Sequence, residues 1–143
     1  MRGDKMALDI KKVEYFSITA DGDAGEAYKL LSVFSNVGVG LFAFKSVPVE
    51  HKRTLFTLFP NDSLKMKIAA KNAGLELDGP YSALIIKSYS DEPGECADIF
   101  KKLSFADINV IEASGIADIK ESYGVVLYLK QEDCEKAIAA LEG

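Results

Sequence analysis

The chain has 143 residues, of which 48% are apolar and 27% are charged, and its formal net charge is −5. This composition is typical of a soluble globular protein and excludes a disordered one. No apolar run approaches the roughly 18 residues that a membrane-spanning helix needs, and the amino terminus lacks the apolar segment of a signal peptide. We therefore expect a cytoplasmic protein.

The charge is divided unevenly along the chain. Residues 1–79 carry 11 Lys and Arg against 10 Asp and Glu, whereas residues 80–143 carry 6 against 12. An acidic second half repels phosphate backbones, so the sequence disfavours a nucleic-acid partner.

The first half of the chain predicts six elements after an amino-terminal tail at residues 1–11. Strands are indicated by runs of β-branched and aromatic residues, and helices by apolar residues that recur at i, i+3, i+4 and i+7. Asp23 is the expected N-cap of the first helix, and Pro48 marks the second strand as an edge strand. The expected elements are strands at 12–20, 39–49, 53–59 and 75–78, a helix at 24–36 and a helix that opens at 60–63 and ends at Gly74.

The second half predicts the same order of elements but one strand fewer. Gly79 and Pro80 mark the boundary between a first domain at 12–79 and a second at 80–143. The expected elements of the second domain are strands at 82–89, 109–116 and 123–130 and helices at 93–105 and 131–141.

An internal repeat supports this division into two domains. Shifting the sequence by 69 residues aligns Asp23–Glu26 with Glu92–Glu95, and it aligns the apolar face of the first helix with that of the third. The order strand, helix, strand, strand, helix, strand is that of a ferredoxin-like domain. We therefore predict an α+β fold of two ferredoxin-like βαββαβ repeats packed side by side, the second lacking its last strand.

The missing strand leaves an unpaired sheet edge, and exposed edges tend to be covered. Residues 6–11, the fourth strand of the first repeat and another copy of the chain are the three candidates for covering it. We expect a homodimer.

The sequence contains no recognisable catalytic or metal-binding group. Cys96 and Cys134 stand far apart without a nearby His, and both occupy apolar helix positions, so we expect buried thiols and no metal. His51 lacks a neighbouring nucleophile, and no phosphate-binding glycine motif is present. We therefore expect no cofactor and no enzymatic activity. The acidic residues Asp91, Glu92 and Glu95 complement the positive end of the helix that follows them.

The turn before the third helix is nevertheless suited to binding a small carboxylate. Pro93 at a helix start loses no hydrogen bond and Gly94 lets the backbone approach closely, so free N–H groups are presented. In a ferredoxin-like layout we expect this turn to lie near the start of the next strand, where the amide of Asn109 is both donor and acceptor. Together they suit an amino acid.

Four segments together resemble the ACT domain, the small-molecule regulatory module of amino-acid metabolism. They are the strand before residue 91, the loop Asp91–Glu95, the stretch from Leu103 to Val110 and the strand Tyr123–Leu127. The resemblance covers residues 12–143 as two copies. It implies βαββαβ domains that pair into a continuous sheet and bind an effector, usually an amino acid, at the interface between paired domains.

The resemblance also implies the ligand-binding residues. In the second copy they are Asp91, Glu92, Pro93, Gly94, Glu95 and Asn109. In the first copy they are Asp23, Ala24, Gly25 and Gly40. The first copy departs from the pattern because Ala24 replaces the proline and Gly40 replaces the asparagine.

We thus expect a non-catalytic regulatory protein that binds an amino acid or similar small carboxylate and passes that state to an enzyme or regulator. The alternative is a structural protein–protein interaction module without a ligand. A small ferredoxin-like enzyme is a third alternative, which turnover would reveal.

Overall fold

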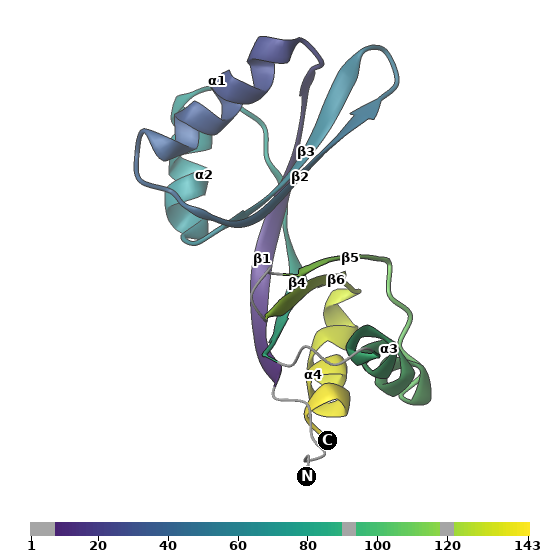
Figure 1. Cartoon of the computed structure of the whole chain (residues 1–143). Coiled ribbons are helices and arrows are strands. Elements are labelled where there is room, and N and C mark those ends of the chain that lie inside the picture. Colours follow the sequence, from purple (N-terminus) through teal and green to yellow (C-terminus); the bar gives the residue numbers. More distant parts are fainter. Residues whose placement is uncertain (1–7, 90–93, 118–121) are drawn as a thin grey trace. The chain divides into compact units, whose positions relative to one another are not determined.

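The computed structural model describes residues 8–89, 94–117 and 122–143 (Figure 1). The elements in these residues, in chain order, are β1 (Leu8–Asp21), α1 (Ala24–Ser35), β2 (Leu41–Val49), β3 (Arg53–Pro60), α2 (Ser63–Asn72), β4 (Asp78–Ser88), α3 (Glu95–Phe105), β5 (Glu112–Ala117), β6 (Tyr123–Tyr128), the short 3₁₀ helix η1 (Gln131–Asp133) and α4 (Cys134–Glu142). The predicted α+β class is confirmed. None of the helices in these residues is long and apolar enough to cross a membrane.

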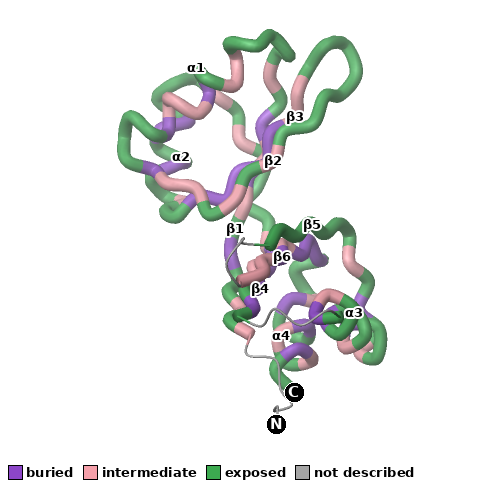
Figure 2. Tube along the Cα trace, in the orientation of Figure 1, coloured by how far each residue is buried: buried purple, intermediate pink, exposed green. Residues whose placement is uncertain are grey.

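The strands form a sheet of order β2-β3-β1-β4-β6-β5. The registers of β1 with β3, β2 with β3, β4 with β6 and β5 with β6 are all antiparallel. The two ends of this order are β2, which contains Pro48 as expected of an edge strand, and β5, which is exposed along its whole length (Figure 2).

The chain divides into two compact units. We call Glu14–Tyr81 the continuous unit, because it is one stretch of chain. We call the other the split unit, because it joins the amino-terminal segment ending at Val13 to Ser82–Gly143. Strands β1 and β4 each contribute residues to both units. The side-by-side packing of two ferredoxin-like repeats stays a prediction.

The core of the continuous unit lies between its strands and the helices α1 and α2. Its apolar side chains come from every second residue of β1 and β3 and from one face of each helix, as amphipathic elements require. The buried members are Phe16, Ile18, Leu30, Phe34, Val39, Phe56, Leu58, Met66, Ala69 and Ala70. The helices start at acidic N-caps, since Asp23 accepts from the N–H of Gly25 and Asp62 from that of Lys65. The predicted cap at Asp23 is confirmed.

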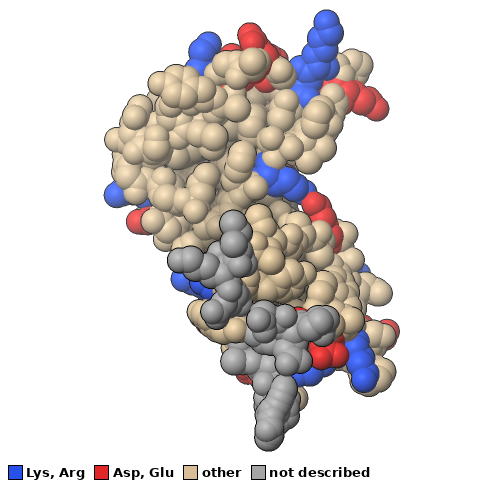
Figure 3. All heavy atoms as spheres, viewed as in Figure 1, with Lys and Arg blue, Asp and Glu red and all other residues tan. Residues whose placement is uncertain are grey.

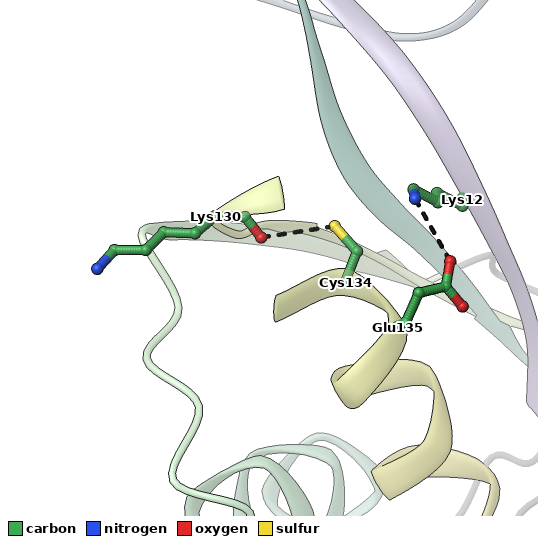
Figure 4. A network of polar contacts seen from close by, with 4 residues as sticks. All are labelled: Lys12, Lys130, Cys134 and Glu135. Carbon is green, nitrogen blue, oxygen red and sulfur yellow. Dashed lines mark hydrogen bonds and ion pairs between the residues drawn. The ribbon is translucent and has the colours of Figure 1, made fainter. Parts of the chain in front are cut away.

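The split unit has a corresponding core beneath α3 and α4. Its buried members are Leu84, Ile86, Ile99, Leu103, Ile108, Val125, Leu127, Leu129, Cys134, Ala137 and Leu141. Leu8 and Ile10 of β1 pack against this core. Beside them Lys12 Nζ donates to the Glu135 carboxylate on α4 at 3.3 Å (Figure 4). Of the three candidates for the missing strand, the structure thus uses the start of the chain, and residues 8–11 are strand and not the expected tail.

The domain boundary expected at Gly79 and Pro80 falls inside β4, which runs from Asp78 to Ser88, and the two compact units divide between Tyr81 and Ser82. The pairing of β4 with β6 begins only at Ala83, which lies opposite Tyr128. Pro80 therefore lies where β4 has a strand neighbour on one side alone, and a proline without N–H is tolerated there. Residues 75–77, expected to begin a fourth strand, make no strand pairing. Their alternation is nevertheless kept, since Leu75 and Leu77 pack against the core of the continuous unit.

Candidate functional site

The described part of the predicted ligand loop is the start of α3. Gly94 holds a left-handed backbone, with φ +93°, and as the N-cap it makes no side-chain hydrogen bond. A helix start of this kind leaves backbone N–H groups without intrahelical partners, and these groups attract anions. Asp91, Glu92 and Pro93 lie outside the described residues.

Glu95, the last residue of the predicted loop, has a side-chain partner on β4. Its side chain is buried, with 8% of the residue exposed, and its carboxylate accepts a hydrogen bond from the Ser88 hydroxyl at the end of β4. A buried carboxylate needs such a partner. Glu95 therefore fixes the start of α3 to the sheet, and its side chain is buried and not on the surface of the loop.

The next residue, Cys96, reaches β6. The Tyr123 hydroxyl donates to the Cys96 thiol, and this bond, with lesser help from burial, raises the pKa of Tyr123. Tyr123 lies opposite Ser88 in the β4–β6 register, so both side-chain contacts of the α3 start are made at one end of the split unit. Sequence reasoning missed Ser88 and Tyr123, because only strand pairing brings them to this end.

Asn109 lies at the other end of the split unit. It follows α3 in a loop and lines a groove of 340 Å³ together with Phe100, Ser104, Asp107 and Val110. The strand expected to begin at Asn109 begins at Glu112, which lies opposite Tyr128, whereas the α3 start lies near the Ser88–Tyr123 pair. The 11 residues of α3 separate the two places by about 16 Å. The expectation that the turn and Asn109 are neighbours is therefore wrong within one unit.

The corresponding residues Asp23 and Gly40 of the continuous unit already have hydrogen-bond partners within the chain. At Asp23 the side chain accepts from Gly25 N–H at 3.4 Å, so the start of α1, where Ala24 is the first residue, carries its own cap. The Gly40 N–H donates to the Asn61 side chain at 3.0 Å, and the Gly40 carbonyl accepts from the Asn61 N–H at 2.8 Å. A Cβ on Gly40 would lie 3.0 Å from that side chain. These contacts account for Asp23 and Gly40 without a ligand.

The two thiols differ in burial. Cys134 is fully buried at the start of α4, and burial is the main cause that raises the pKa of its thiol, which donates to the Lys130 carbonyl at 3.7 Å (Figure 4). Cys96 is only partly buried. Within the described residues, no group of three His, Cys, Asp or Glu side chains is placed to hold a metal ion.

No protein-family model and no curated protein matches the chain. Solved structures do match it along nearly its full length. A protein of Bacteroides thetaiotaomicron superimposes with a TM-score of 0.78 at 17% identity, covering 93% of this chain and 88% of that one. The regulatory subunit of aspartate kinase from Thermus thermophilus gives a TM-score of 0.66 at 16% identity, covering 96% and 94%. The fold is ACT-like.

Aspartokinase III of E. coli, in complex with lysine and aspartate, matches at a TM-score of 0.57 and 10% identity, and the chain covers 34% of it. At these identities the likeness shows the fold. The ACT-like fold agrees with the α+β class that the sequence predicts.

Proposed function

We propose that this protein is a non-catalytic regulatory protein of two ACT-like units, which binds an amino acid or similar small carboxylate between paired units. The observation that carries the proposal is the uncapped start of α3 at Gly94 within an ACT-like fold. Its free N–H groups suit the carboxylate of the ligand. The regulatory subunit of aspartate kinase, which covers 96% of this chain, supports the regulatory assignment.

The difference between the two helix starts favours the split unit as the binding unit. In α1 the Asp23 carboxylate already accepts from a backbone N–H, whereas no side chain of the described residues caps α3. An incoming carboxylate would have to displace Asp23 at α1, and at α3 it would displace none of the described side chains. Asp91, Glu92 and Pro93 complete the proposed loop.

The distance between Gly94 and Asn109 determines how the site is completed. One split unit holds these residues at opposite ends of α3, so one small ligand reaches both only where two units meet. We therefore propose that a second copy of the chain supplies Asn109 to the loop of the first. A monomeric mass in sedimentation, with and without ligand, would remove this part of the proposal.

A thermal-shift screen against the twenty amino acids tests the ligand. A ligand that binds only the native state at a hundredfold excess over its Kd stabilises it by about 2.7 kcal/mol. We expect one or a few amino acids to raise the Tm of the wild type, and Asn109→Ala to abolish the shift that at least one of them causes. Asn72→Ala, which removes an exposed amide from the end of α2, is the matched control and should keep it. No shift with any amino acid contradicts the proposal.

One observation favours the structural interaction module as a second candidate. Large apolar side chains are exposed on the outer surfaces of α1 and α2, namely Tyr28 at 77%, Leu64 at 67% and Ile68 at 53%. The space-filling view shows few charged side chains over these helices (Figure 3). Exposed apolar patches mark interaction sites. Absence of amino-acid binding together with loss of partner binding in Ile68→Asp would establish this candidate.

A further inference from the structure

A groove of 880 Å³ lies in the continuous unit, apart from Gly94 and Asn109. It is formed by residues 17–20 of β1, by Arg53 and Leu55 of β3, and by residues 74–78. It exists because residues 75–77 do not pair with β1. Among the described residues, no backbone hydrogen bond joins 74–77 to 17–20. The size is that of a small-molecule site.

The polar side chains of the groove share the sheet face opposite the helices. Phe16 and Ile18 belong to the core, so Ser17 and Thr19 point to the other face, as alternation in a strand requires. In the register Thr19 lies opposite Leu55 and Asp21 opposite Arg53. Arg53 and Thr19 are therefore diagonal neighbours, within reach of a long side chain.

The opposite wall is acidic. Leu75 and Leu77 pack against the core, whereas Glu76 and Asp78 are exposed and line the groove together with Ser17 and Thr19. Asp78 is engaged, because it accepts from the Tyr81 hydroxyl at 2.6 Å, and this bond raises the pKa of Tyr81. Glu76 is exposed and has no ion pair among the described residues.

Arg53 of β3 and Glu76, which precedes β4, both line the groove, and β1 lies between β3 and β4 in the sheet order. Within the described residues Arg53, like Glu76, has no ion pair. A guanidinium binds a carboxylate through two parallel hydrogen bonds, and a carboxylate binds an ammonium group.

We propose that this groove is a second binding site, for a small zwitterion of the α-amino-acid type, whose carboxylate binds Arg53 and whose ammonium group binds Glu76. Ser17 and Thr19 of β1 line the same groove and supply hydroxyl groups to it. Glu76 and Asp78 repel multiply charged anions, so the groove excludes phosphates and nucleotides. The site stands independently of the one at Gly94 and Asn109.

Calorimetric titration of the full chain tests the proposal, with the twenty amino acids as probes. For an amino acid that binds, Arg53→Gln and Glu76→Gln should each raise the Kd about tenfold or more, because each removes a charge-assisted hydrogen bond. Both side chains are exposed, so the fold should persist. Lys52→Gln, the matched control, removes the adjacent charge outside the groove and should leave the Kd unchanged.

Modified probes assign each contact. The N-acetyl derivative of the same amino acid lacks the ammonium group, so its binding should be weaker in the wild type and insensitive to Glu76→Gln. Asn109→Ala should leave binding at the groove intact, which separates it from the site between paired units. The proposal is overturned if every amino acid that binds keeps its Kd in both Arg53→Gln and Glu76→Gln, or if none binds.

Discussion

Gly25 and Gly94 occupy equivalent places in the repeat but have different physical reasons to be glycine. Gly94 holds a left-handed φ of +93° at the N-cap of α3, whereas Gly25 lies inside the first turn of α1 without a left-handed φ. Apart from the glycine and its chain neighbours, no heavy atom of the described residues lies within 4 Å of a Cβ added at either position. Within the described residues, backbone conformation is therefore what distinguishes the two glycines.

This difference predicts opposite effects of the same substitution. Gly94→Ala should lower the free energy of unfolding by about 1 kcal/mol, because an L-residue is strained in the left-handed region. Gly25→Ala should raise it by about 0.5 kcal/mol, because the change restricts the unfolded chain without native strain. Urea unfolding of both variants measures this. Equal effects would contradict the conformational difference between the two copies.

At the scale of elements, β1 decides the organisation of the chain. Its first residues, Leu8 and Ile10, pack against the core of the split unit, and Phe16 and Ile18 belong to the core of the continuous unit. In each unit the core residues of β1 are two positions apart, as packing on one side of a strand requires. A single strand thus carries two short apolar patterns, and the interruption at Lys12 is explained by its bond to Glu135.

The beginning of β1 should therefore contribute to stability. Ile10→Ala should lower the free energy of unfolding by about 1–2 kcal/mol, somewhat less than the cost in a fully buried core, because Ile10 is only partly buried. Asp9→Ala alters the exposed neighbour on the other face and should change it by no more than about 0.5 kcal/mol. The denaturation midpoints of the two variants measure this difference in stability. If Ile10→Ala were as neutral as Asp9→Ala, residues 8–11 would behave as the tail first expected.

For the whole molecule, the division into units does not follow a single cut in the chain. The split unit needs the segment ending at Val13 as well as Ser82–Gly143. A fragment that starts at the predicted boundary, residues 80–143, keeps both helices but loses the strand that neighbours β4 on one side. An open sheet edge and a core without Leu8 and Ile10 would then be exposed to water.

We expect the fragment 80–143 to lack a cooperative thermal transition in circular dichroism. A chain in which Glu14–Tyr81 is replaced by a short Gly-Ser turn is the control, because it keeps β1 and β4 as neighbours and should unfold cooperatively. Cooperative unfolding of 80–143 alone would mean that the start of the chain is dispensable for this unit.

The sequence by itself determined the α+β class, the four helices, the N-cap at Asp23 and the resemblance to a regulatory module. These depend on local periodicity and capping, which a short window of residues carries. The position of Asn109 could not be predicted, because it depends on the length of the loop between α3 and β5. Its apparent nearness to the Gly94 turn came from the topology expected and not from any residue pattern.

Only the tertiary structure decided which strand completes the split unit, why Glu95 is buried against Ser88, and that residues 75–77 leave a groove beside β1. Each of these is a pairing between residues distant in sequence. Alternation shows that Leu75 and Leu77 face a core, but it cannot say whether the backbone between them reaches hydrogen-bonding distance of a neighbour. Strand partners are chosen by the packing of the whole sheet, and that information is absent from any single segment.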